Sequence, residues 1–224
     1  MAATNTCKCR LGVSRALVGL LLLSWTGLSA VTLQQKPAEK QEWRSLFDGK
    51  TLTNWKSTNF GGEGEVKVQN GKIIIGMGAT LSGITWVGGE IPHMNYEISL
   101  EAMKTSGNDF FCGLTFPVGN SPCSLIVGGW GGSVVGLSSI DGMDASENET
   151  STVGDFAQNR WYRIRLRVTP RKIEALIDDK SVVDVVTTGR QISIRPEVLL
   201  SQPLGIATWI TEAALRDIKI RMVD

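Results

Sequence analysis

The stretch WYRIRLRVTPRKIEALID, residues 161–178, establishes the fold class because it reads as two antiparallel strands joined by a tight turn. If Pro170 and Arg171 form a two-residue turn, apolar side chains of the two strands lie directly opposite one another. The apolar pairs are Val168 with Ile173, Leu166 with Ala175, and Ile164 with Ile177. This register gives the hairpin one continuous apolar face, which we expect to cover a core.

The other face of the same hairpin carries charges in the same register. It sets Arg167 opposite Glu174, and Arg163 opposite Asp178. The apolar pattern and the charge pattern therefore agree on one alignment, and opposite charges across a strand pair stabilise it. We interpret these arginines as a structural ladder rather than as a site for an anionic ligand.

The chain on either side of this hairpin repeats the strand pattern. From Trp43 onward, apolar or alternating segments are separated by Gly, Asn, Pro and Asp, which is typical of an all-β protein, and no long helix is expected. In EVKVQNGKIII, residues 65–75, Asn70 and Gly71 supply the two positive-φ positions of a type I′ hairpin turn. Residues 43–224 are enough for one domain, and we predict a two-sheet antiparallel β-sandwich.

The last predicted strand, EAALRDIKIRM, breaks its own alternation. Ile218, Ile220 and Met222 share one face, but Leu215 is out of phase with them. Either a β-bulge lies between Leu215 and Ile218, or Arg216 turns inward; the sequence leaves both open.

The N-terminus has the layout of a secretory signal. Three basic residues precede an apolar run, residues 16–23, and small residues follow as far as Ala30. We predict a signal peptide over residues 1–30, a disordered linker over 31–42, and a secreted or periplasmic protein. A membrane contact is expected only if the signal segment is not cleaved.

Composition excludes several classes of function. Loss of residues 1–30 removes three of the 23 basic residues and none of the 22 acidic ones, so the remaining chain carries a net charge of −2 and is not expected to bind nucleic acid. With one histidine and no clustered Cys and His, neither a metal nor a cofactor is expected. Cys112 and Cys123 could form a disulfide, although a hairpin turn at residues 118–121 would place them opposite different partners.

Several motifs together resemble one family. They are LFDGKTLTNW at residues 46–55, NGKIII, NYEISLE, NRWYRIRLRV and a closing LRDIKIRM. These motifs resemble the 3-keto-disaccharide hydrolase family over residues 43–224. The resemblance implies a concanavalin-like lectin/glucanase jelly roll, in which LFDGKTLTNW packs beside the last strand.

The resemblance also implies an activity: exported cleavage of 3-keto-disaccharides and 3-keto-glucosides. A ketone at C3 acidifies the neighbouring C–H, so a base can remove that proton, the aglycone leaves, and water adds back. This chain departs from the family pattern where relatives carry polar residues, with CSLIVGGWGGSVVGLSSIDG, Pro117 and GIATWIT in their place. A non-catalytic, lectin-like carbohydrate-binding module is therefore the alternative, and a structural or adhesion domain without a sugar ligand also remains open.

Two tryptophans are candidates to bind a sugar ring. Trp130 lies in GGWGG, residues 128–132, where bare backbone surrounds a flat ring that could stack on a sugar. Its structural interpretation is a tight hairpin in which Trp130 caps the sandwich. The resemblance places Trp209 on a concave-face strand, where it is either a stacking platform or part of the core.

The candidate catalytic groups are Asp141 and Asp144 in a polar loop, Glu212 on a turn after Trp209, and His93 as a general base. Each has an ordinary surface or structural interpretation as well. Asn148 begins a glycosylation sequon, which matters only in a eukaryotic secretory route.

Glu97 and Glu101 in NYEISLE share one face of a strand. They lie about 13 Å apart along it, too far for the roughly 5 to 9.5 Å of paired glycosidase carboxylates. A solvated strand face is the default interpretation, with Glu101 kept as a candidate substrate contact.

Overall fold

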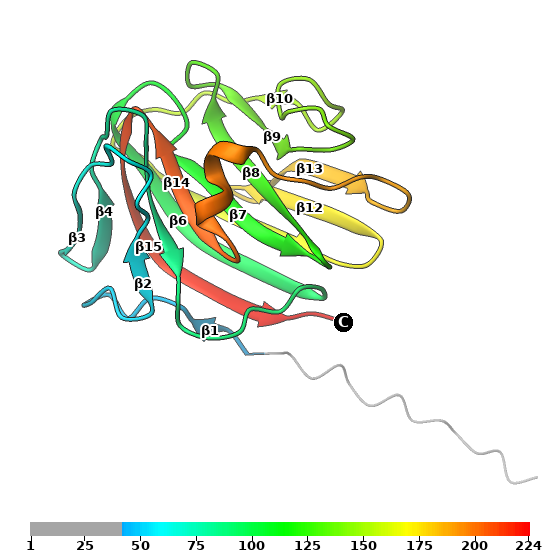
Figure 1. The fold of residues 1–224 in the computed structure, drawn as a ribbon, viewed down its shortest axis with the longest axis horizontal. Helices are drawn as coiled ribbons and strands as arrows, with labels where there is room; N and C mark the ends of the chain where they lie inside the picture. Colours follow the sequence, from blue (N-terminus) through cyan, green and yellow to red (C-terminus); the bar gives the residue numbers. More distant parts are fainter. Residues whose placement is uncertain (1–41) are drawn as a thin grey trace, which may run out of the picture. The chain divides into compact units, whose positions relative to one another are not determined.

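The computed structural model describes residues 42–224. The predicted signal peptide, residues 1–30, and linker residues 31–41 lie outside this range. Two antiparallel sheets stack face to face around a hydrophobic core (Figure 1), which confirms the predicted β-sandwich. Among residues 42–224, no helix is long and apolar enough to cross a membrane.

The larger sheet, sheet A, has eight strands. In spatial order they are β13 (Lys180–Val186), β12 (Lys172–Ile177), β11 (Trp161–Val168), β6 (Tyr96–Gly107), β15 (Thr211–Met222), β4 (Lys72–Ile75) and β3 (Val66–Gln69), with β1 (Arg44–Ser45) paired to β15.

The second sheet, sheet B, has seven strands. Their order is β10 (Thr152–Val153), β9 (Val134–Ser138), β8 (Ser121–Gly129), β7 (Cys112–Val118), β14 (Gly205–Trp209), β5 (Leu81–Trp86) and β2 (Trp55–Ser57). The connection from β13 to β14, residues 187–204, crosses in front of β8 and β7 and carries the 3-10 helix η1 (Pro196–Ser201) (Figure 1).

The hairpin of β11 and β12 has the predicted register. Leu166 pairs with Ala175 and the inward side chains of both strands are buried. The predicted charge partners are only partly right. Arg167 does lie opposite Glu174, but Glu174 forms its ion pair with Lys172, and Arg163 forms its ion pair with Asp179.

The reason for the changed partner lies in the turn that follows β12. Asp178 has a φ of 49° and begins this turn, so its carboxylate bends back and accepts the backbone N–H of Arg163 at 2.9 Å. The next residue, Asp179, then meets the guanidinium instead. The register of a strand pair therefore predicted the backbone partners but not the ion pairs at its end.

The stretch LFDGKTLTNW closes one end of the sandwich, as the resemblance implies. The Asp48 carboxylate accepts the backbone N–H groups of Lys50 and Thr51, each at 2.8 Å, and this fixes the turn. Trp55 is buried, packs edge-on against Trp86 with ring centroids 5.2 Å apart, and donates its indole N–H to the Leu46 carbonyl. Strand β1 pairs with β15, the last strand.

Two open questions from the sequence are answered. The register of β15 shifts between Arg216 and Lys219, and Asp217 has a φ of 51°, so a bulge restores the phase while Arg216 stays exposed. Cys112 and Cys123 are both free and buried, because the β7 and β8 register places them opposite different residues, as predicted.

Candidate functional site

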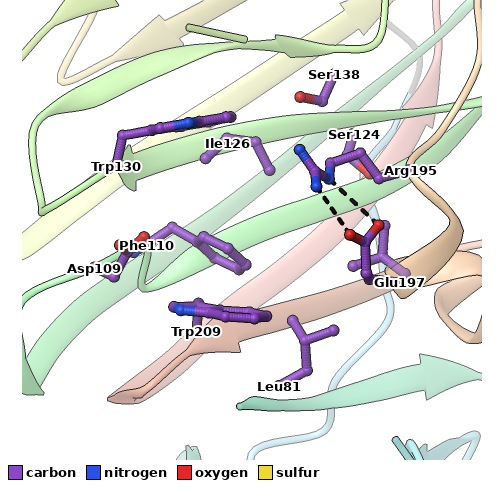
Figure 2. A pocket seen from close by; sticks show the side chains of 11 residues that line it. Leu81, Asp109, Phe110, Ser124, Ile126, Trp130, Ser138, Arg195, Glu197 and Trp209 are labelled. Carbon is purple, nitrogen blue, oxygen red and sulfur yellow. Dashed lines mark hydrogen bonds and ion pairs between the residues drawn. The ribbon is translucent and has the colours of Figure 1, made fainter. Parts of the chain in front are cut away.

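A pocket of about 250 Å³ lies on the outer face of sheet B (Figure 2). Its walls come from four strands, from the β6–β7 and β8–β9 connections, and from the crossing connection 187–204. The lining residues are Leu81, Asp109, Phe110, Ser124, Ile126, Trp130, Ser138, Arg195, Glu197, Val198 and Trp209.

Strand alternation builds the floor of the pocket. In β8, Ser124 and Ile126 point into the pocket, whereas Leu125 between them belongs to the core. The neighbouring strands carry small side chains at this point, because Ala207 of β14 lies opposite Gly113 of β7. A side chain added at Gly113 would approach the Phe110 ring to 3.0 Å, so the glycine allows that ring to rest on the sheet. The outer face is therefore hollowed here.

Trp130 and Trp209 stand on opposite sides of this hollow, with Phe110 and Ile126 between them (Figure 2). Trp209 ends β14, and Trp130 lies in the turn between β8 and β9 with a φ of 48° and 44% of its surface exposed. Positive φ is uncommon for a bulky side chain. The turn thus holds a large ring in contact with solvent, and the structure brings both sequence-predicted aromatic residues to one pocket.

Asp109 ties the two aromatic segments together. One carboxylate oxygen accepts the N–H of Phe110 at 2.7 Å, and the other accepts the N–H of Gly131, next to Trp130, at 3.0 Å. Its own N–H donates to the Thr211 hydroxyl at 3.1 Å. Asp109 therefore fixes the position of Trp130 relative to the floor of the pocket.

The charged end of the pocket is formed by Arg195 and Glu197. The Arg195 Nη2 and Nε atoms donate to the two Glu197 carboxylate oxygens at 2.8 and 3.3 Å, and its Nη1 forms an ion pair with Asp144. Asp144 also accepts the Ser139 hydroxyl at 3.1 Å. The hydrogen bonds from Arg195 hold the pKa of Glu197 below its usual range, so this carboxylate is ionised at neutral pH.

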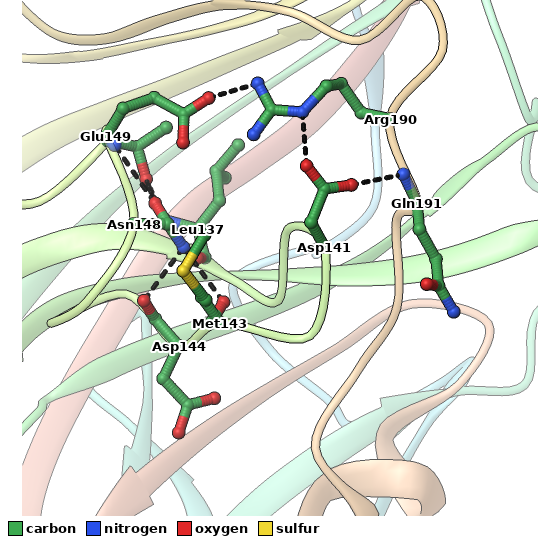
Figure 3. A network of polar contacts seen from close by, with 9 residues as sticks. Leu137, Asp141, Met143, Asp144, Asn148, Glu149, Arg190 and Gln191 are labelled. Carbon is green, nitrogen blue, oxygen red and sulfur yellow. Dashed lines mark hydrogen bonds and ion pairs between the residues drawn. The ribbon is translucent and has the colours of Figure 1, made fainter.

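Asp141 holds the crossing connection in place rather than lining the pocket (Figure 3). Its carboxylate accepts the Gln191 N–H at 2.7 Å and the Arg190 Nε–H at 2.6 Å, and Arg190 reaches Glu149 as well. The Gln191 N–H and, next, Arg190 lower the pKa of Asp141. Asp141 therefore anchors the segment that carries Arg195.

The loop that follows is tightly built around Asn148. Its side-chain amide donates to the carbonyls of Leu137, Met143 and Asp144 at 2.7 to 3.0 Å, and the side chain is buried (Figure 3). A glycan on that nitrogen would have to break these bonds. The sequon is thus incompatible with the folded loop.

The remaining candidates lie away from the pocket. Glu212 belongs to strand β15 rather than to a turn, and it accepts the Thr105 hydroxyl at 2.8 Å. Glu101 forms an ion pair with Arg216 on sheet A. His93 is exposed in the segment before β6. The structure does not bring these three residues to the pocket that holds Trp130 and Trp209.

The environment of Glu97 differs from the solvated strand face expected from the sequence. Its side chain is only 4% exposed and forms ion pairs with Arg165 and Arg221, so this position is a buried charge cluster rather than a solvated strand face. Within residues 42–224, no group of three or more His, Cys, Asp and Glu side chains is arranged to hold a metal ion.

Sequence reasoning missed the polar groups of the pocket. Asp109 and Phe110 lie in a short connection, and Arg195 and Glu197 lie in a crossing segment without periodicity. The only signal was the charge in RPE, residues 195–197, which no motif distinguishes from a surface turn. The pocket therefore contains charged groups that the sequence did not single out.

Comparison with known proteins identifies the family. A family model described as a 3-keto-alpha-glucoside-1,2-lyase-like domain matches residues 42–221. A search of curated proteins gave no significant match.

Solved structures share the fold at low identity. A protein of unknown function with a galectin-like fold from Bacillus subtilis gives a TM-score of 0.54 at 8% identity, over 81% of this chain and 98% of that chain. A protein from Parabacteroides distasonis ATCC 8503, provisionally described as a glycosyl hydrolase, gives 0.52 at 14% identity, over 81% and 94%. The Crh5 transglycosylase in complex with NAG gives 0.52 at 10% identity, over 83% and 85%.

Proposed function

The chain belongs to the 3-keto-alpha-glucoside-1,2-lyase-like family, and from this premise we propose that it cleaves 3-keto-glucosides, including 3-keto-disaccharides, in the pocket on sheet B. One observation carries the proposal: Trp130 and Trp209 line a common hollow, with Phe110 and Ile126 between them. Aromatic rings on opposite sides of a pocket suit the apolar faces of a sugar ring.

The proposed reaction is an elimination followed by hydration. A base removes the proton at C2, next to the C3 ketone, and the resulting enolate expels the aglycone oxygen from C1. The aglycone takes up a proton and leaves as an alcohol, and water then adds across the C1–C2 double bond to give the free 3-keto sugar. The ketone makes this proton acidic enough for a side-chain base.

Two carboxylates line the pocket, and their partners differ. Asp109 is bound by backbone N–H groups and positions Trp130, whereas Glu197 is held by the guanidinium of Arg195. We assign the base to Glu197, which replaces Asp141, Asp144, Glu212 and His93 as the leading candidate. An ionised carboxylate in the pocket is in the protonation state that a base requires.

The test offers the purified chain 3-keto-trehalose and 3-keto-sucrose beside the unoxidised sugars, with products followed by mass spectrometry and binding by calorimetry. Trp130→Ala and Trp209→Ala should each raise Kd about fivefold or more, since loss of an aromatic anchor costs more than about 1 kcal/mol. Trp161→Ala, on sheet A, is the matched control. Equal binding by all three variants, or no product from any keto sugar, contradicts the proposal.

A non-catalytic, lectin-like module is the second candidate, and a specific observation favours it. Both carboxylates of the pocket already accept hydrogen bonds, and an ion pair with a lowered pKa makes Glu197 a weak base. Sugar binding without product in the experiment above, together with unchanged binding by Glu197→Gln, would support this function instead.

We also propose that the chain is exported. The support is the order of basic, apolar and small residues in 1–30. Fractionation of expressing cells tests it: the processed chain should appear outside the cytoplasm, and replacement of the apolar run by polar residues should retain it inside.

A further inference from the structure

The guanidinium of Arg195 extends into the pocket between Ser124 and Glu197 (Figure 2). An arginine side chain has five N–H donors in one plane. Within residues 42–224, three of them are engaged: Nε and one Nη2 donor by Glu197, and one Nη1 donor by Asp144. One N–H on each terminal nitrogen thus remains for a ligand, and 42% of the side chain is exposed to reach it.

The charges around Arg195 determine what kind of ligand can accept these bonds. Asp144 and Glu197 together carry two negative charges against one positive charge, and Asp109 adds another negative charge to the pocket wall. A carboxylate or sulfate on the ligand would therefore meet net negative charge. An uncharged oxygen, such as a carbonyl, can accept the hydrogen bonds without this repulsion.

We propose that Arg195 is the residue that binds the ketone oxygen of an uncharged 3-keto-glucoside, and that Asp144 is a positioning residue that aims it. This inference rests on the proposed function and names the group that the reaction needs at the ketone. Asp144 lies outside the pocket lining but holds the Nη1 atom, and Ser139 holds Asp144 in turn.

Arg195 acts where negative charge develops. As the C2 proton passes to the base, its bonding electrons form the C2–C3 double bond of the enolate and the C3 oxygen becomes negative. Donors that are already oriented toward that oxygen stabilise this state more than the neutral ketone. Two flanking carboxylates hold the guanidinium so that little reorganisation is needed, and they leave its two remaining N–H groups for the substrate.

The experiment compares Arg195→Gln with Arg163→Gln, which removes an ion-paired arginine from the outer face of sheet A. Three quantities are measured on the full chain: the rate of product formation from 3-keto-trehalose, the rate of deuterium incorporation at C2 in D₂O, and Kd for 3-keto-trehalose and for trehalose. A thermal melt of each variant reports folding.

Arg195→Gln removes the N–H donors at the ketone oxygen and should lower the rates of product formation and of deuterium incorporation by about 10²- to 10³-fold. Kd for trehalose should change by less than about threefold, because the unoxidised sugar has no ketone. Asp144→Asn should lower kcat while KM stays nearly constant, and guanidinium ion at a non-denaturing concentration should partly restore Arg195→Ala.

The outcomes separate the two proposals. If the unchanged chain and Arg195→Gln turn over 3-keto-trehalose at equal rates, Arg195 does not have the proposed role, and the proposed function stands. If the unchanged chain binds 3-keto-trehalose but does not turn it over, Arg195→Gln must still weaken the binding of 3-keto-trehalose more than the binding of trehalose. An equal loss of affinity for both sugars overturns the inference. Absence of both binding and turnover in the unchanged chain overturns both proposals.

Discussion

Replacement of Asn148 by alanine is the sharpest test of the loop that supports the pocket. The side chain is 5% exposed and takes part in five hydrogen bonds, three as donor to carbonyls and two as acceptor from Thr150. A buried hydrogen bond contributes about 0.5 to 1.5 kcal/mol net. Because the amide nitrogen has only two N–H groups, these contacts amount to at most four independent hydrogen bonds, which set a range of roughly 2 to 6 kcal/mol.

We expect a loss of about 3 kcal/mol, near the lower end, because a surface loop can open locally and let water bind the freed groups. For a domain of this size that loss corresponds to a fall in Tm of about 6 to 12 °C. Urea unfolding followed by tryptophan fluorescence gives the free energy, with an unchanged m value required for the comparison.

Asn120→Ala is the control, since Asn120 is exposed at the turn between β7 and β8. It should change stability by no more than about 0.5 kcal/mol. A loss below about 1 kcal/mol for Asn148→Ala would refute the reasoning, because it would mean that the loop does not depend on its buried amide.

Two further predictions concern titratable groups. Burial raises the pKa of Cys112 and of Cys123 to about 12, so in a chain with Cys7 and Cys9 replaced by serine neither remaining thiol should react with a thiol reagent at pH 8 until denaturant is added; rapid reaction of that folded variant would contradict their burial. The pKa of Asp141 is lowered by Gln191 and Arg190, and a depressed carboxyl stabilises the fold above its unfolded pKa and loses that effect as pH falls through its folded pKa. Thermal melts should therefore show a loss below about pH 4 that is smaller in Arg190→Gln, and identical pH profiles would argue against the anchor.

The fold was predictable because its signals are local and repeated. In the 161–178 hairpin, the apolar pattern and the charge pattern give the same register, and Asn70 with Gly71 fits one turn type. A wrong register in one hairpin would therefore have disagreed with a second, independent pattern. The sequence showed the bulge in β15 as a break in the alternation of apolar residues. It did not show the backbone geometry of that bulge. Ion partners were less predictable, since the Arg163 partner depends on the turn conformation of Asp178.

The pocket was predictable only in its aromatic half. Trp130 and Trp209 stand out as large rings in glycine-rich or strand-end contexts, and both line the pocket. Asp141 and Asp144 stood out as carboxylates, but an acidic side chain in a loop gives no sign of whether it faces a ligand or an arginine. Here both face arginines from the crossing connection. Pairing between segments about 50 residues apart is a tertiary property that no local pattern encodes.

The connection between β13 and β14 explains why the pocket forms on sheet B. The open outer face of that sheet has small residues, but a shallow hollow alone would leave a sugar exposed on one side. The connection crosses this face and brings Arg195, Glu197 and Val198 against it. Asp141 and Asp144 hold the connection down through Arg190 and Arg195. The acidic loop thus contributes to the site by placing a second wall opposite the tryptophans, and variants of Asp141 should alter binding although Asp141 does not line the pocket.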